Sequence, residues 1–408
     1  MRHSTERIRS THGGNLPRPE EFDALLRQDA VVTPEVAARL PGAVQYVVDR
    51  QIDCGIDVIN DGEYVKAAGG GSYAGYIHQR VTGWEVQPVN PAKRKREGVG
   101  ARERRMFPGF YESGLWLQGS GGPVRPGYFK PGVSPERTTE RVATGPVAYT
   151  GHAAIKADID ALTTALAGKP TGSESTGVEG FIAALGPLSL GAGARNEYYS
   201  SEEEYMTAVA ETVREEYKAI TDAGFIVQVD EPEFATSWQF YPDWDVPRYR
   251  QYLESCVEII NHALDGIPED QVRFHVCWGS GHRPHVTDID LVHIADLLLK
   301  VKAQAYSIEA GNVRHAHEWT VWRDVKLPDG KILVPGVISH ATDLVEAPGL
   351  VAERLVNYAS VVGRENVQAG TDCGIGSRVG HEEIVWAKLR AMAQGCALAS
   401  DRLWGRAA

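Results

Sequence analysis

The stretch that decides the fold is Arg273–Gly279, RFHVCWG, in which His275 and Cys277 stand two residues apart on an expected β-strand. Side chains alternate between the two faces of a strand, so His275 and Cys277 point to the same side. An imidazole and a thiol that converge in this way can hold a soft-leaning divalent metal. An isolated H-x-C also suits a buried strand with a packed histidine and an inert cysteine, because free cysteine is among the most buried residue types. The other strands of the chain have to decide between these interpretations.

The sequence on both sides of this stretch alternates between short apolar strands and amphipathic helices. An alternation of this kind predicts a parallel sheet. Eight units favour a (β/α)8 barrel over an open sheet, because no G-x-G-x-x-G or Walker A phosphate turn follows the first strand. We therefore expect an α/β fold with one barrel domain over residues 1–408. The strands are expected near residues 9, 57, 144, 227, 274, 306, 335 and 368. The helices are expected near residues 35–51, 153–167, 201–223, 247–264, 289–300, 349–362 and 382–398.

Two segments do not fit a simple strand–helix unit. Residues 67–140 are rich in Gly, Pro, Tyr and Arg, and they are too long for a plain loop, so we expect an excursion after the second strand with short strands of its own. The apolar run Phe181–Leu190 is expected to be a buried segment that leads to a loop. Within the excursion, Lys93–Arg96, Arg102, Arg104 and Arg105 form a basic patch. We favour a solvated face or a subunit contact for this patch, with an anion site for an acidic substrate tail as the alternative.

Composition excludes several classes of protein. A formal net charge of −12 argues against general nucleic-acid binding. No run of about 18 apolar residues predicts a membrane span, and the charged start MRHSTERIRS does not resemble a secretory signal. Five widely spaced cysteines fit a reducing cytoplasm better than a disulfide framework. Oligomeric state is left open, with a homo-oligomer as one option.

Polar residues follow most of the expected strands, and the carboxyl ends of barrel strands converge. Taken singly, Cys373 suits a core, Glu309 a helix cap and His340 a loop, but their shared placement favours a metal. Two cysteines, one histidine and one glutamate from three strands are a ligand set typical of zinc. Such a site can hold an incoming thiol as its thiolate. Histidines in loops beyond the strands are expected to contact substrate or support the ligands. The residues at the strand ends are His12, Glu63, Asp230, His275, Cys277, Glu309, His340, Asp372 and Cys373; the loop histidines are His282, His285, His315 and His317.

At these residues the sequence resembles the catalytic barrel of the cobalamin-independent methionine synthase family. The motifs that carry the resemblance occur in the same order: THGGNLPRP, DVINDGE, ATGPV, VQVDEP, FHVCWG, YSIEAGN, VPGVISH and GTDCG. The resemblance implies a Zn²⁺ site and a proton-handling pair beside the thiol substrate. It implies the metal ligands His275, Cys277, Glu309 and Cys373, the catalytic residues Asp230 and His340, and the substrate-binding residues His12, Asn15, Glu63, Glu231 and Asp372.

Two departures distinguish this chain within that resemblance. Gly14-Asn15 takes the place of the family's Gly-Ser, so carboxylate recognition is expected to differ. No tryptophan follows the TGPV strand to stack a folate ring. The residues of the HVCWG and LPDGKILVPGV motifs are more similar to those of the short, single-barrel branch of the family. That branch also includes the epoxyalkane:coenzyme M transferases.

The resemblance implies a cytoplasmic zinc-dependent enzyme that alkylates a small-molecule thiol with an alkyl donor. Methyl transfer to a homocysteine-like thiol, giving methionine, is the favoured reaction, because Glu63 is similar to the family's amino-group ligand. Opening of an epoxide by coenzyme M is the alternative. Its anionic sulfonate would require a basic residue such as Arg18 or one from the basic patch. A zinc hydrolase or lyase, or a protein with structural zinc, is the alternative of another class.

Overall fold

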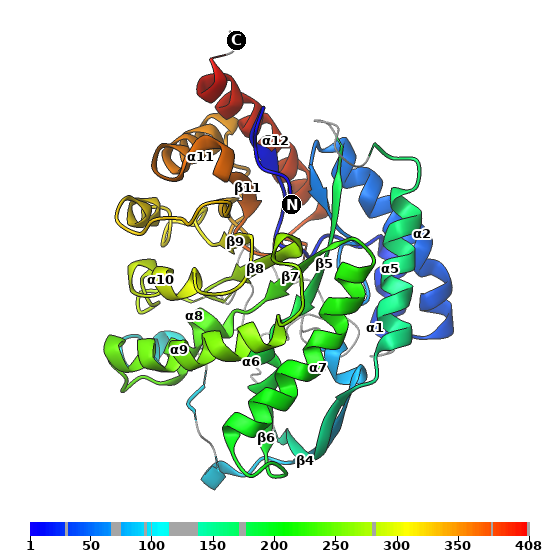
Figure 1. The fold of residues 1–408 in the computed structure, drawn as a ribbon, viewed down its shortest axis with the longest axis vertical. Coiled ribbons are helices and arrows are strands. Elements are labelled where there is room, and N and C mark those ends of the chain that lie inside the picture. The colour runs from blue at the N-terminus through cyan, green and yellow to red at the C-terminus, as the bar shows by residue number, and fades with distance from the viewer. Residues whose placement is uncertain are drawn as a thin grey trace.

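Eight parallel strands form a central sheet that is nearly closed into a (β/α)8 barrel, as predicted (Figure 1). The computed structural model describes residues 1–405 except 29–31, 67–74, 94–95, 99, 114–137, 171–176, 280–282 and 377. At the seam between the two end strands, the Asp57 amide donates to the Ser10 carbonyl at 3.1 Å. The strand order is β1 (Arg9–Ser10), β11 (Gln368–Thr371), β10 (Ile332–Ile338), β9 (Ala305–Ile308), β8 (Val272–Val276), β7 (Ile226–Asp230), β5 (Glu179–Leu185) and β2 (Val58–Ile59).

The middle strands of the barrel are buried on both faces, because side chains fill the barrel interior and helices cover its outside. Every residue of β7, β8, β9 and β10 is buried. The register aligns Asp230 with His275 and His275 with Ser307 on three neighbouring strands. These three side chains therefore stand at one level, at the carboxyl end of the barrel.

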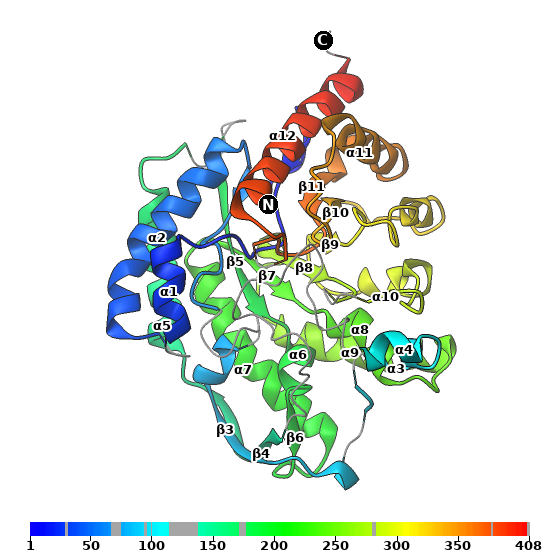
Figure 2. The ribbon, with the colours of Figure 1, turned by 180° about the vertical axis from the view of Figure 1, so that it is seen from behind.

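Helices surround the sheet, as both views show (Figures 1 and 2). The Ser201 hydroxyl accepts from the Glu204 amide at 3.0 Å and caps α7, as the capping box predicted. The helix expected over 289–300 is shorter than predicted: this segment holds a 3-10 turn, Leu291–His293, and the short helix α10. The helices are α1 (Glu20–Gln28), α2 (Pro34–Asp53), α3 (Ala101–Arg104), α4 (Pro108–Glu112), α5 (His152–Leu166), α6 (Pro187–Gly191), α7 (Glu202–Asp222), α8 (Glu233–Phe240), α9 (Val246–Ala263), α10 (Ala295–Leu298), α11 (Pro348–Val362) and α12 (Glu382–Trp404). Among the described residues, no helix has the length and apolar character needed to cross a membrane.

One barrel strand was assigned to the wrong segment. The strand expected near residue 144 is β4 (Thr139–Tyr149), which pairs antiparallel with β3 (Val81–Pro88) and parallel with β6 (Ala194–Asn196) in a separate three-stranded sheet. The barrel strand is β5, within the run expected to lead to a loop. Burial explains the difference, because β4 alternates between buried and exposed residues whereas the last five residues of β5 are all buried.

The described part of the basic patch binds other parts of the same chain. Arg102 donates to the carbonyls of Trp238, Tyr241 and Trp244, each at 2.7 Å. Arg96 forms an ion pair with Glu233 at 3.0 Å, and α3 consequently lies beside α8 and α9 (Figure 2). Arg94 and Lys95 lie outside the described residues. The patch thus anchors the excursion to the helices that follow β7.

Candidate metal centre and active site

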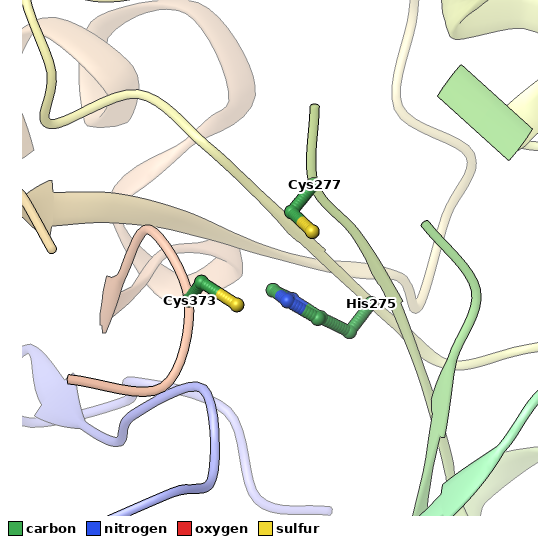
Figure 3. Close-up of side chains that lie close together, drawn as sticks. All are labelled: His275, Cys277 and Cys373. Atoms are coloured by element: carbon green, nitrogen blue, oxygen red, sulfur yellow. The ribbon is translucent and has the colours of Figure 1, made fainter. Parts of the chain in front are cut away.

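Three of the four predicted metal ligands meet at the carboxyl end of the barrel (Figure 3). His275 lies on β8, Cys277 is the first residue after that strand, and Cys373 lies in the loop after β11. One ligand atom from each of the three lies within 4.8 Å of the others. All three side chains point toward a common centre. The i, i+2 spacing on β8 places the imidazole and the first thiol on one face, as the sequence predicted.

The chemistry of this cluster fits a soft-leaning metal ion. His275 Nδ1 lies 3.0 Å from the Ser307 hydroxyl, which orients the ring, while the buried Nε2 has no hydrogen-bond partner among the described residues. Cys277 and His275, both beside Cys373, lower the pKa of the Cys373 thiol well below its usual value. A thiolate, a thiol and a free imidazole nitrogen form a donor set that zinc accepts. The residues present therefore fit zinc.

Glu309, the fourth predicted ligand, belongs to a neighbouring group with His340 and Asp372. Ligand atoms of these three residues also lie within 4.8 Å of one another. Glu309 Oε1 accepts from the Trp278 amide at 2.9 Å, so its carboxylate borders the peptide that follows Cys277. Burial, and then the Asp372 charge, raise the pKa of Glu309 well above its usual value. Coordination of a metal by Glu309 remains a prediction.

Asp372 and His340 differ in how they are held. Asp372 Oδ1 accepts from the amides of Ala310 and Gly311 at 2.8 and 2.6 Å, so this side chain fixes the loop after Glu309. His340 is buried and its Nδ1 has no hydrogen-bond partner among the described residues. Burial lowers the pKa of His340, which favours a neutral ring that can accept a proton.

Asp230 and Glu63 bring two buried carboxyl groups to the same end of the barrel. Gln228 Nε2 donates to Asp230 Oδ1 at 2.8 Å. Burial raises the pKa of Asp230. Burial also raises the pKa of Glu63 to about 8, and the nearby Asp230 charge adds to this rise. Glu63 has a left-handed backbone with φ of 57°, a conformation that non-glycine residues rarely adopt.

The other predicted substrate residues make contacts within the chain. His12 Nε2 lies 2.7 Å from Gln51 Oε1, and its Nδ1 accepts from the Gly14 amide at 3.2 Å. Burial lowers the pKa of His12 to about 3, so the ring is neutral. Glu231 accepts from the Leu188 and Ser189 amides, whereas the buried Oδ1 atom of Asn15 has no hydrogen-bond partner in the part of the chain that the structure describes. Substrate contact by these residues remains a prediction.

Two features of the site were missed in the sequence. Lys66 is buried three residues after Glu63, and it is a cation among the site's carboxyl groups. Its position in the DGEYVK loop was the available signal. Gly14 is the second feature, because a Cβ atom at Gly14 would stand 1.9 Å from Glu63 Oε1. The backbone of the first loop thereby leaves room for the Glu63 carboxylate.

The fold and this cluster define a class: a (β/α)8-barrel protein with cysteine and histidine side chains gathered at the carboxyl ends of its strands. The family described as "Cobalamin-independent synthase, Catalytic domain" matches residues 136–397, more than half of the chain. The chain belongs to this family.

The curated relatives that match this chain carry the names of two different enzymes. A 2-hydroxypropyl-CoM lyase of Xanthobacter autotrophicus is 25% identical over 251 residues, which are 55% of this chain and 60% of the relative. A methionine synthase of Thermococcus kodakarensis is 26% identical over 213 residues, 52% of this chain and 54% of the relative. The chain thus spans little more than half of the length of these curated relatives.

Solved structures share the fold over nearly the whole chain. A B12-independent methionine synthase from a Shewanella species, in complex with selenomethionine, has a TM-score of 0.66 at 18% identity and covers 98% of this chain and 99% of its own. A putative B12-independent methionine synthase from Listeria monocytogenes has a TM-score of 0.62 at 17% identity, with the same coverage. At these identities the likeness establishes the barrel architecture.

Proposed function

We propose that this protein is a zinc-dependent transferase that alkylates a small-molecule thiol, and that its favoured reaction is methyl transfer to a homocysteine-like acceptor. The observation that carries the proposal is the convergence of His275, Cys277 and Cys373 within 4.8 Å. Membership of the cobalamin-independent synthase family and similarity to a methionine synthase support it.

The residues of the cluster have the chemistry for zinc. His275, Cys277 and Cys373 would hold the ion, with Glu309 as the fourth ligand. Bound zinc would lower the pKa of an entering thiol and favour its thiolate at neutral pH. A thiolate-rich donor set is better suited to this task than to the activation of water.

The remaining groups handle the proton and orient the substrate. Asp230 or neutral His340 accepts the proton that the thiol loses, since both stand at the same end of the barrel. The acceptor sulfur then attacks an electrophilic carbon of the donor, forming a sulfur–carbon bond while the leaving group departs. Glu63 binds the amino group of the acceptor. Water is kept away because each of these side chains is buried.

Epoxide opening by a thiol is the second candidate, and the similarity to 2-hydroxypropyl-CoM lyase favours it. The two candidates share the activated thiol and differ in its head group and in the carbon that is attacked. A zinc hydrolase or lyase would act without an added thiol.

A matrix of substrates tests the proposal. Purified protein, with its zinc content measured, is incubated with homocysteine, coenzyme M, glutathione or cysteine against methyl donors and small epoxides, and the products are read by mass spectrometry. We expect an S-methylated homocysteine. Products that form equally well without thiol would contradict the proposal, and the Cys277→Ala variant should give no product.

A further inference from the structure

Lys66 is a buried lysine in the same tight turn as Glu63. Its side chain is almost fully removed from solvent, with 4% exposed. The Lys66 amide donates to the Glu63 carbonyl at 3.1 Å, so the two side chains leave opposite ends of one turn. A buried lysine normally requires a compensating partner.

The side chain of Lys66 contacts the edge of β5 that β2 pairs with only in part. Strand β2 pairs with β5 at Val58 and Ile59 alone, so within the described residues the later part of β5 has no strand partner on that side. Glu179, at the start of β5, donates its amide to Asp57 on that side, and Ala183 presents its backbone to the same side because strand residues alternate. Lys66 Nζ donates to the Ala183 carbonyl and lies 5.0 Å from the centre of the Tyr76 ring.

These contacts leave donors of the ammonium group unused. An ammonium group has three N–H donors, and within the described residues Ala183 takes one of them. Burial raises the pKa values of Asp61, Glu63 and Asp230, and the charge of Lys66 opposes that rise at each of these carboxyl groups. No ion pair joins Lys66 to a carboxylate in the described part of the chain, and its remaining donors are therefore available to a ligand.

Three of the described cations considered for an anionic head group already have partners within the chain. Arg18 Nε contacts Asp23 at 2.8 Å. Arg96 pairs with Glu233, and Arg102 is held by three backbone carbonyls. Lys66 differs from them because it stands beside Glu63 and within the field of Asp230.

We propose that Lys66 binds the carboxylate of the acceptor thiol, opposite Glu63 at its amino group, so that one turn selects a zwitterionic amino-acid thiol. This assignment rests on the proposed function and names its acceptor class. It also accounts for Gly14-Asn15, where a serine hydroxyl is absent: the negative head group has a cationic partner elsewhere. An anionic thiol without an amino group would leave the Glu63 carboxyl group without a partner.

Binding of three thiols to the zinc-loaded full-length protein tests this assignment. Isothermal titration calorimetry compares homocysteine with 3-mercaptopropylamine, which lacks the carboxylate, and with 4-mercaptobutyrate, which lacks the amino group. For the wild type, loss of the carboxylate should weaken binding about tenfold or more, as expected for a hydrogen bond to a charged group. In Lys66→Met, the affinity for homocysteine should fall by a similar factor, while the affinity for 3-mercaptopropylamine should not change. Glu63→Gln should instead remove the preference for the amino group.

The outcomes separate this proposal from the proposed function. If Lys66→Met weakens the binding of homocysteine and of 3-mercaptopropylamine equally, Lys66 does not bind the carboxylate. Its role would then be structural, as a donor to the β5 backbone. A wild type that binds none of the thiols would overturn both the proposed function and this inference. Lys66→Arg keeps the charge and should keep part of the preference for the carboxylate, even where Lys66→Met folds poorly. Zinc content and melting temperature of each variant check the fold.

Discussion

Cys373 reaches His275 across two intervening strands. His275 lies on β8 and Cys373 follows β11, while β9 and β10 stand between them in the sheet. Their ligand atoms nevertheless lie within 4.8 Å of each other, because the closed barrel turns the carboxyl ends of its strands toward one axis. The site therefore depends on barrel closure as well as on local sequence.

Removal of either thiol should weaken metal binding. We expect Cys277→Ala and Cys373→Ala to lower zinc affinity by at least about tenfold, since loss of even a supporting group costs about 10–100-fold in metal affinity, and to leave less than one zinc ion per chain after purification. Metal analysis by mass spectrometry measures this directly. The matched control is Cys256→Ala, a buried cysteine of α9 outside the cluster, which should keep its zinc. Full zinc in the Cys277 and Cys373 variants would refute the ligand assignment.

Gly14 should control the position of the Glu63 carboxylate. A Cβ atom at Gly14, where φ is 124°, would collide with Glu63 Oε1, so Gly14→Ala should weaken homocysteine binding by about tenfold or more. Gly42→Ala is the control, because Gly42 lies in α2 with no atom within 4 Å of an added Cβ. It should leave binding unchanged and raise stability by about 0.5–1 kcal/mol. Unchanged calorimetric affinity in Gly14→Ala would show that Glu63 does not contact the acceptor.

His340 should act on the reaction rather than on thiol binding. His340→Gln removes a buried, neutral proton acceptor, so kcat should fall by about 10²–10⁴-fold while the KM for thiol changes little. His262→Gln is the control, because His262 is a partly exposed histidine of α9 outside the site, and this variant should retain full activity. Steady-state kinetics, with the donor that the substrate matrix selects, provide the measurement. A change confined to KM would assign His340 to substrate binding.

Strand periodicity and motif order were enough to predict the barrel and the gathering of His275, Cys277 and Cys373. They failed where tertiary context decides. The strand signal of β4 is genuine, but β4 belongs to the separate three-stranded sheet outside the barrel, whereas β5 is too uniformly apolar to show a period. The DGEYVK loop placed Lys66 near the site, but its burial and its acceptor, the Ala183 carbonyl 117 residues away in sequence, could not be predicted. The partners of Arg102 are similarly distant.

His315 should make stability depend on pH. It lies between Asp288 and Glu318, with its Nδ1 2.7 Å from Glu318 and its Nε2 3.4 Å from Asp288. Burial alone would lower its pKa, but the nearby Asp288 carboxylate and the hydrogen bond to Glu318 outweigh burial and raise the pKa to about 10. A histidine whose pKa is higher in the folded state contributes stability fully below the unfolded value of about 6.5, and loses that contribution as pH rises through about 10.

Urea unfolding of His315→Gln measures this dependence. At pH 6 the variant should be less stable than the wild type by about 3 kcal/mol, because two buried carboxylates lose their cation. The difference should shrink steadily between pH 6.5 and 10, as the wild-type imidazolium loses its proton. His317→Gln should show no such trend, since His317 is exposed. A difference that stays constant from pH 6 to pH 10 would mean that His315 is neutral in the folded protein and that packing, rather than charge, accounts for its effect.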